Sequence, residues 1–557
     1  MSLQTLRLAT PAAQTDTDIG VLDVQELLRL LQHDGELALV DVREQGVYAR
    51  DGHIIHAVPL PLSRLELRAR ELIPRAGVPV VVTDAGDGAL AHAAAARLRR
   101  LGFTDLRLLE GGVAAWKAAG QQVYTGSGSY SKAFGEFVEH TYATPHISPA
   151  ELQQKLDAGE VLLLDGRTLG EFEDFSIPGA HAIPNAELPW RIHALAPSAD
   201  TPVVVHCAGR TRSIIGAQAL INAGIRNPVA ALEDGTMAWL FEGRTLQYGR
   251  TPAALPEVSG AARQSAQAAV QHLSRRYGIR WLDEAGLRAL QNERDERSLY
   301  VLDVRSKAEY DAGHLPGARW AEGGELVQGL ERFVGVRGAR VVVVDDANGA
   351  RAAITASWLL QLNRSEVYAH AVPEGADHTA VPAWAPWEAP AAPRTASLPA
   401  AALQSRLAGG RTVVLDLSSS LEYEAGHIPG AHFAIRSRLD ARALAALAPQ
   451  ATAWVLTAAD ERLARFAAAD LAVAPDRPDP VEVLVLEGGN AAWRAAGLPQ
   501  EEGATSLLHP AEDVWRSPYQ VPDRFAAFRA YLDWERQLLK QVQQDPTVRF
   551  RVFAEAP

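Results

Sequence analysis

The chain has 557 residues, of which 47% are hydrophobic and 22% charged, and its formal net charge is −13. This composition is typical of a globular protein of three or four domains, and the negative charge argues against a nucleic-acid-binding surface as its main function. The single cysteine excludes an intrachain disulfide framework and a multi-cysteine metal site, so we expect a reducing, cytoplasmic environment and no metal. Apolar runs stay shorter than the ~18 residues of a membrane helix, and residues 1–20 lack a signal- or transit-peptide pattern, so no membrane contact is expected.

An apolar strand that ends in an aspartate occurs four times, at Asp41, Asp165, Asp303 and Asp416. A second, β-branched run and then an alanine-rich helical stretch follow in each copy; these runs are 78–83, 202–206, 341–344 and 454–457. Alternating short strands and helices predict a parallel sheet covered on both faces. We therefore expect four tandem α/β units, each a small doubly wound parallel sheet with helices on both faces, over residues 16–125, 144–250, 278–385 and 395–503.

The segments between the units have their own composition. Residues 125–143 and 386–399 are rich in Gly/Ser and Pro/Ala and are interpreted as linkers, whereas 252–277 predicts a loop followed by a helix. The tail, 504–557, carries aromatic and aliphatic residues at helical spacing, which predicts a helix packed on the body or, alternatively, an interaction surface.

Cys207 directly follows the β-branched run of the second unit. A short loop with Arg210 and Arg212 comes next, and Ser213 is expected to open a helix. A strand, a tight loop and a helix N-terminus form an anion cradle, because backbone N–H groups and the helix dipole converge there. Such a cradle also favours a thiolate, and hence a nucleophile. The alternative is a buried structural cysteine.

Three further motifs recur in a constant order across the copies. They are Asp-x-Arg at the strand end, Gly-His-Ile/Leu-Pro-Gly-Ala, and Glu-Gly-Gly-x-x-Ala-Trp, as seen at 41–43, 426–431 and 110–116. With the cysteine loop, this order resembles the rhodanese sulfurtransferase family. The resemblance implies that Cys207 takes the outer sulfur of a small anionic donor such as thiosulfate, and that a thiophilic acceptor such as cyanide or a thiol removes it from the persulfide. It implies no cofactor.

The candidate substrate-binding residues surround this cysteine. Backbone N–H groups of the loop should face the sulfur, Gly209 allows its curl, and the two arginines can stabilise the thiolate and a donor oxyanion. One arginine could instead pair with Glu233 or Asp234. Two loop cations favour thiosulfate over 3-mercaptopyruvate, whose enzymes in this family resemble a more neutral loop. Trp190 and Arg191 are expected to line the pocket mouth. The full set is Cys207 as the nucleophile and, for substrate binding, Ala208, Gly209, Arg210, Thr211, Arg212, Ser213 and Arg191.

Neighbouring polar residues are assigned structural roles. Asp165, Arg167 and Glu171 have counterparts in copies that lack the cysteine, which favours a salt-bridge role. His206 is expected to close the strand end, because a thiolate held by N–H donors needs no general base.

The other three units are expected to be catalytically silent. Asp84, Asp346 and Ala458 are aligned with the cysteine, and neither a carboxylate nor a methyl group can form a persulfide. A scaffolding role is favoured, and a homo-oligomer is left open. Two-domain rhodaneses pair a silent N-terminal unit with an active one, so the resemblance implies that unit one pairs with unit two, and unit three with unit four.

Two other classes of function are retained as alternatives. Dual-specificity phosphatases, and an arsenate reductase, share the fold, but the phosphatases use Cys-x5-Arg, whereas Arg212 gives Cys-x4-Arg and Ser213 takes the phosphatase arginine's position. A non-enzymatic sulfur-relay protein would instead pass the Cys207 persulfide to a protein partner.

Overall fold

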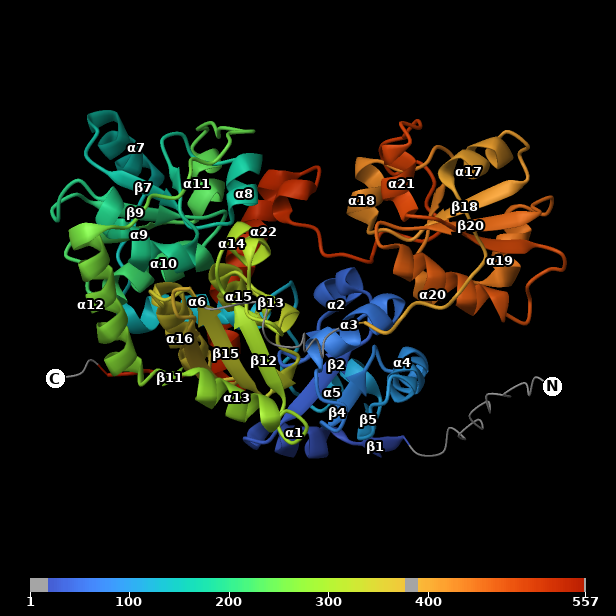
Figure 1. Ribbon diagram of the computed structural model, residues 1–557, viewed down its shortest axis with the longest axis horizontal. Helices are drawn as coiled ribbons and strands as arrows, with labels where there is room; N and C mark the ends of the chain where they lie inside the picture. Colours follow the sequence, from blue (N-terminus) through green and yellow to red (C-terminus); the bar gives the residue numbers. More distant parts are fainter. Residues whose placement is uncertain (1–18, 376–388, 555–557) are drawn as a thin grey trace, which may run out of the picture.

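The computed structural model describes residues 19–375 and 389–554, which form four α/β units in the order of the sequence copies (Figure 1). The ends expected at 16 for the first unit and 385 for the third, the linker residues 386–388 and the tail residues 555–557 lie outside the described residues. Within the described ranges, the structure contains no helix with the length and apolarity needed to cross a bilayer.

The first two units are built from alternating strands and helices. Unit one contains β1 (Gly20–Leu22), α1 (Val24–Gln32), β2 (Leu37–Asp41), α2 (Gln45–Asp51), β3 (Val58–Pro59), the 3-10 helix η1 (Leu62–Arg64), α3 (Leu65–Leu72), β4 (Val80–Thr83), α4 (Ala89–Arg100), β5 (Leu106–Leu109) and α5 (Gly112–Ala118). Unit two contains β6 (His146–Ile147), α7 (Pro149–Ala158), β7 (Leu162–Asp165), α8 (Leu169–Asp174), β8 (His181–Ala182), η2 (Asn185–Glu187), α9 (Leu188–Leu195), β9 (Val203–His206), α10 (Thr211–Asn222), β10 (Val229–Leu232) and α11 (Gly235–Phe241).

The other two units follow the same plan. Unit three contains β11 (Arg280–Leu282), α13 (Glu284–Asn292), β12 (Leu299–Asp303), α14 (Lys307–Ala312), β13 (Arg319–Trp320), α15 (Gly323–Gln328), η3 (Leu330–Arg332), β14 (Val336–Arg337), β15 (Arg340–Asp345), α16 (Ala350–Leu362) and β16 (Glu366–Ala371). Unit four contains β17 (Ser397–Leu398), α17 (Ala400–Leu407), β18 (Thr412–Asp416), α18 (Ser420–Ala425), β19 (His432–Phe433), η4 (Arg436–Arg438), α19 (Ala441–Leu447), β20 (Ala453–Thr457), α20 (Glu461–Ala472), β21 (Glu482–Leu486) and α21 (Gly489–Ala495).

The four sheets share one strand order, which confirms the predicted doubly wound parallel fold. The orders are β1-β5-β4-β2-β3, β6-β10-β9-β7-β8, β11-β16-β15-β12-β13 and β17-β21-β20-β18-β19. Central strands such as β2 and β12 are buried at every residue, because helices cover both faces of the sheet. One strand crosses between units, since β14 of unit three pairs antiparallel with β2 of unit one.

The Asp-x-Arg motif joins each strand end to the next helix. In unit two, Arg167 donates to Asp165 at 3.0 and 2.8 Å, and Thr168 and Glu171 then form a capping box at the start of α8. Units one and three repeat the Asp–Arg pair, at 41–43 and 303–305. The turn is therefore set by local residues, in agreement with the predicted salt bridge.

The expected pairing of neighbouring units is wrong. Unit two faces unit three, with η2 packed on α16, and unit one faces unit four, with η1 packed on η4 (Figure 1). A helix stands in each of the first two connections. Residues 129–142, interpreted as a linker, form the helix α6 (Ser129–Tyr142), and α12 (Gly260–Tyr277) confirms the predicted helix before unit three. The 14 residues of α6 span about 21 Å between units one and two. The 18 residues of α12 span about 27 Å and pack against both α9 of unit two and α16 of unit three.

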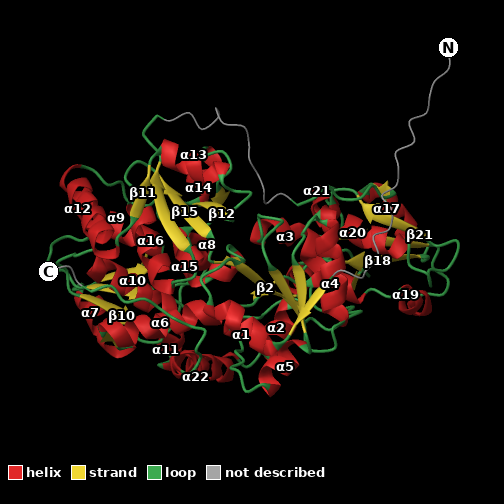
Figure 2. Cartoon of the chain, turned by 90° about the horizontal axis from the view of Figure 1, so that it is seen from below, coloured by secondary structure: helices red, strands yellow, loops and turns green. Residues whose placement is uncertain are grey.

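The predicted tail helix is α22 (Arg524–Gln543), preceded by the short helix η5 (Pro518–Gln520). Helix α22 packs along α6 and lies beside unit two, close to α11 at the lower edge of Figure 2. Gly135 lies in the middle of α6, and glycine there favoured the interpretation of this segment as a linker rather than a helix. A Cβ there would lie 2.9 Å from the Cγ2 atom of Thr211, so the glycine allows α6 to approach the cysteine loop.

Candidate active site

Cys207 lies at the carboxyl end of β9 and is 3% exposed. The Ser213 hydroxyl donates to its Sγ atom at 3.1 Å, and α10 begins at Thr211, two residues before the expected start. The N-terminus of α11 covers the loop, because the Thr236 N–H donates to the Cys207 carbonyl at 2.9 Å. Gly235 has φ 55°, and a Cβ on it would lie 2.4 Å from that carbonyl oxygen, so only glycine fits there.

Both loop arginines are neutralised by carboxylates. Arg210 pairs with Glu136 at 2.7 and 3.0 Å, with Asp234 at 3.0 Å, and with Glu139. The predicted alternative partner Asp234 is therefore confirmed for Arg210. Burial disfavours the charged form, but these carboxylates outweigh it and raise the pKa of Arg210. A donor oxyanion must consequently rely on backbone N–H groups more than on this guanidinium.

Arg212 connects the cysteine loop to unit three. It pairs with Glu171 of its own unit at 2.6 Å and with Glu325 of α15 at 3.1 Å, and its main-chain carbonyl accepts from Asn185 at 2.9 Å. Burial opposes its charge, yet Glu171 and Glu325 raise the pKa of Arg212 well above the usual range. The position of the active loop is thus tied to the junction between units two and three.

A buried network of charged and polar groups surrounds His206 at the end of β9. His206 is fully buried, and its Nε2 atom lies 3.6 Å from Asp165 and 3.4 Å from the Ser176 hydroxyl. Burial alone would raise the pKa of Asp165, but His206, Arg167 and Ser176 hold it at about 2. Burial lowers the pKa of His206. The histidine therefore packs under the strand end, as expected of a structural group.

Residues from the tail close over the loop, a contact that no motif in the sequence indicated. The Tyr519 hydroxyl donates to the Ala208 carbonyl at 3.2 Å, and Tyr531 lies against Gly209, at 3.2 Å from the position of a Cβ. The Glu535 carboxylate accepts from the Thr211 N–H at 3.3 Å and from its hydroxyl. The tail thus completes the environment of Cys207.

In unit one, a carboxylate occupies the position of the thiol. Asp84 is buried, and it accepts backbone N–H bonds from Gly86 at 2.9 Å, Gly88 at 3.3 Å and Ala91 at 3.1 Å. Counted from Asp84 and Cys207, the equivalent residues of unit two are Gly209, Thr211 and Ile214, in the loop and in the first turn of α10. The loop is therefore an anion cradle, and in unit one its own side chain fills it.

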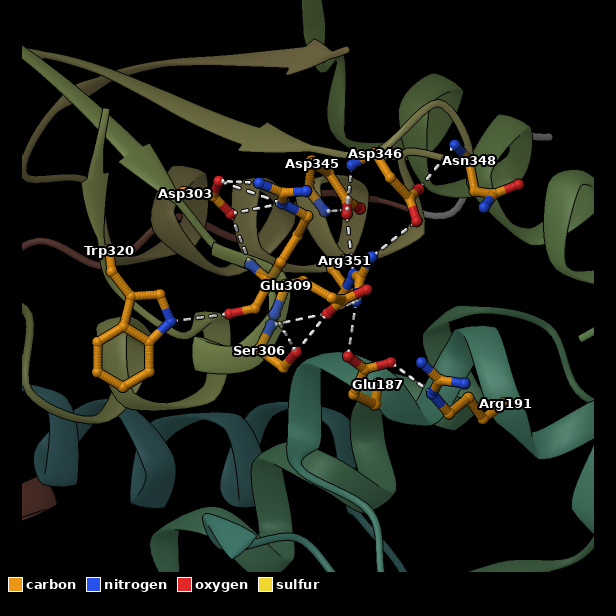
Figure 3. Close-up of polar contacts among 12 residues, drawn as sticks. Glu187, Arg191, Asp303, Ser306, Glu309, Trp320, Asp345, Asp346, Asn348 and Arg351 are labelled. Carbon is orange, nitrogen blue, oxygen red and sulfur yellow. Dashed lines mark hydrogen bonds and ion pairs between the residues drawn. The ribbon is translucent and has the colours of Figure 1, made fainter. Parts of the chain in front are cut away.

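The alignment of unit three was wrong by one residue. The strand register pairs Asp303 with Val344 where Asp165 pairs with His206, so Asp345 takes the position of the cysteine and Asp346 follows it. The shift arises because β15 extends to Asp345, one residue beyond the apolar run. Asp345 accepts from the Ala352 N–H at 3.0 Å and from Arg351 at 2.8 Å, so this cradle too is filled from within (Figure 3).

Arg351 joins this cradle to unit two. Its guanidinium contacts Glu309 at 2.9 Å, Asp346 at 2.8 Å and, across the junction, Glu187 at 2.9 Å (Figure 3). Glu187 also binds Arg191 at 2.7 Å. The structure thus places Arg191 on Glu187 and the Pro256 carbonyl, in the junction, rather than against the cysteine loop.

A cavity of about 430 Å³ lies at the junction of units two and three. It is lined by Glu325, the partner of Arg212, together with apolar and polar groups from both units, among them Leu169, Trp320, Glu322 and Phe333. Burial and the nearby Glu325 and Glu187 raise the pKa of Glu322 to about 8. This volume is in the range that holds a small molecule. Among residues 19–375 and 389–554, no group of His, Cys, Asp or Glu has the arrangement of a metal site.

The fold and the site define a tandem α/β protein with one cysteine in an anion-binding loop. The family model of the Rhodanese-like domain matches four segments, 23–119, 148–242, 286–371 and 399–496. The chain belongs to the rhodanese family.

The proteins similar to this chain match different shares of its length. The crystal structure of a thiosulfate sulfurtransferase from Pseudomonas aeruginosa superposes with a TM-score of 0.89 at 42% identity, covering 96% of this chain and all of that one. A probable 3-mercaptopyruvate sulfurtransferase of the same species is 37% identical over 137 residues, or 24% of this chain and 47% of its own length. An HTH-type transcriptional regulator of Mycobacterium tuberculosis is 34% identical over 103 residues, or 18% of this chain and 45% of its own length. The chain thus matches less than half the length of these two curated relatives.

Proposed function

We propose that the protein is a sulfurtransferase that moves a sulfane sulfur from thiosulfate to a thiophilic acceptor through a persulfide on Cys207. The observation that carries this proposal is the buried Cys207 thiol in a loop whose counterpart in unit one binds a carboxylate with three backbone N–H groups. Similarity to a thiosulfate sulfurtransferase over 96% of the chain supports it.

The first half-reaction is a displacement at sulfur. The Cys207 thiolate attacks the outer sulfur of thiosulfate, the Sγ–S bond forms, the S–S bond of the donor breaks, and its electron pair leaves with sulfite. The Ser213 hydroxyl, 3.1 Å from Sγ, stabilises the thiolate by donation. N–H groups of residues 208–213 bind the oxyanion.

The second half-reaction regenerates the thiolate. A nucleophile such as cyanide attacks the outer sulfur of the persulfide, the new C–S bond forms, and the S–S electron pair returns to Cys207. Because donor and acceptor react in turn at one sulfur, the kinetics should be ping-pong. Units one, three and four carry Asp84, Asp345 and Ala458 at this position and cannot take part. A single reactive thiol fits a reducing compartment such as the cytoplasm.

Intact mass spectrometry after incubation with thiosulfate tests the proposal. We expect the mass of one added sulfur atom, lost again on addition of cyanide, and no gain in Cys207→Ser. A parallel incubation with 3-mercaptopyruvate compares the two donors, and hydrolysis of p-nitrophenyl phosphate tests the phosphatase alternative. Absence of the sulfur adduct with both donors would refute a sulfurtransferase.

A further inference from the structure

A carboxylate from the tail occupies the backbone cradle of the cysteine loop. Glu535 is fully buried, and its Oε1 atom accepts from the Thr211 N–H at 3.3 Å and from the Thr211 hydroxyl. Its Oε2 atom has no hydrogen-bond partner within the described residues. An anionic group from α22 therefore enters the loop that should bind an anionic substrate.

Unit one shows what the equivalent N–H group binds there. Thr211 is four residues after Cys207, and the residue four positions after Asp84 is Gly88, whose N–H donates to the Asp84 carboxylate at 3.3 Å. The equivalent N–H group therefore binds a carboxylate oxygen in both units. In unit one the carboxylate is part of the loop, whereas in unit two it belongs to a helix 324 residues away.

We propose that Glu535 is a specificity-determining residue of the Cys207 site, whose carboxylate competes with the oxyanion group of the sulfur donor for the Thr211 N–H group. The inference rests on the proposed function. A dianionic donor such as thiosulfate then binds well only when Glu535 is protonated, whereas an uncharged sulfane donor is not opposed. Glu535 thus acts on donor binding and not on the bond-making step.

The surroundings of Glu535 allow this protonation near neutral pH. Burial, the largest effect, and Glu136 raise its pKa to about 7, while Lys132, Thr211 and Arg210 act in the opposite direction. The charged and titratable groups that face it are Lys132 and Glu136 on α6, Arg210 on the loop, and Tyr531 on α22. The Cys207 thiol lies on the loop side, within electrostatic reach of Tyr531.

Proton linkage gives the size of the effect. If a group with pKa about 7 must be protonated for the donor to bind, the donor affinity falls about tenfold between pH 6 and pH 8. Glutamine at 535 keeps an acceptor for the Thr211 N–H but carries no charge. Glu535→Gln should therefore bind thiosulfate with an affinity that is nearly independent of pH, and about tenfold tighter than the parent at pH 8.

Calorimetric titration of thiosulfate into proteins with Cys207→Ser measures binding without turnover. The parent should lose about tenfold in affinity from pH 6 to pH 8, and the Glu535→Gln protein should not. Asp533→Asn is the matched control, because Asp533 lies on the same helix with its side chain 71% exposed, and it should behave like the parent. Equal pH dependence with and without Glu535 would overturn the role of this residue.

Two further measurements keep the inference falsifiable. If Glu535→Gln does not fold, the wild-type kcat/KM for thiosulfate is compared with that for dimethyl trisulfide, and the ratio must fall between pH 6 and pH 8. A constant ratio overturns the inference. Intact masses of the proteins that retain Cys207 separate this inference from the proposed function. If a persulfide forms but Glu535 has no pH-linked effect, only this inference is refuted. If no protein forms a persulfide, the proposed function is refuted.

Discussion

Arg351→Met should weaken the junction of units two and three. Arg351 is 2% exposed and contacts the buried carboxylates of Asp345 and Glu187, which are 0% and 4% exposed. Glu187 keeps Arg191, but Asp345 loses its cation and is left with backbone N–H groups. Removing one partner of a buried ion pair costs about 3–5 kcal/mol, so we expect a loss of unfolding free energy of that size at pH 8.

The loss should depend on pH in a defined direction. Burial raises the pKa of Asp345, and Arg351 lowers it, so removing the arginine raises it further. An acid with a higher pKa in the folded than in the unfolded state stabilises the fold at low pH, and that contribution is lost as the pH rises through the folded value. The deficit of Arg351→Met should therefore be smaller at pH 5 than at pH 8.

Urea unfolding followed by tryptophan fluorescence measures both effects, since Trp320 and Trp358 lie in unit three. Lys307→Met is the matched control, because Lys307 is 56% exposed and its pair with Asp311 should contribute less than about 1 kcal/mol. A deficit below about 1 kcal/mol at pH 8, or an equal deficit at both pH values, would refute the view that Arg351 neutralises a buried carboxylate.

Three further predictions concern the active unit. Ser213→Ala removes the hydrogen-bond donor that lies 3.1 Å from Sγ. Because a hydrogen bond to a charged group contributes about 1.5–3 kcal/mol, quench-flow mass analysis should show that sulfur loading of Cys207 is slowed about tenfold to a hundredfold. A rate within twofold of wild type contradicts this role. Gly135→Ala places a Cβ 2.9 Å from Thr211 and should lower the free energy of unfolding by about 1–3 kcal/mol, measured by thermal unfolding. Gly170→Ala adds a Cβ in open space within the described structure and should not lower it. Equal effects of the two changes would contradict the packing argument. The pKa of Asp165, about 2, is below its unfolded value, so its stabilisation is present above about pH 4 and lost as the pH falls toward 2. Asp165→Asn should reduce this acid-dependent loss of stability by roughly 2–3 kcal/mol, and an unchanged acid profile would contradict this.

The sequence predicted the features that short segments determine. The strand ends, the Asp165–Arg167 turn and the α8 capping box each depend on residues within a few positions of one another. Hydrophobic patterning then gives strands and helices in the right order. For these reasons the four-unit doubly wound fold and the position of Cys207 at a strand end could be read from the chain.

Contacts over long sequence distances could not be read in this way. Glu136 and Glu139 reach Arg210 from 74 and 71 positions away, and Glu535 reaches Thr211 from 324 positions away. The three-residue spacing of Glu136 and Glu139 could have indicated one face of a helix, had Gly135 not been interpreted as a sign of a linker. The register of Asp345 depended on where β15 ends, which is set by pairing with β12 and β16.

The contact between α22 and the cysteine loop has a consequence for biosynthesis. During translation at about 5–20 residues per second, the 324 positions between Thr211 and Glu535 delay the arrival of the helix by roughly 15–65 s. Unit two can fold in that interval before Tyr519, Tyr531 and Glu535, which cover its thiol loop, have been synthesised. Cys207 is therefore most open to oxidation while the chain is still being made, and docking of the helix ends that exposure.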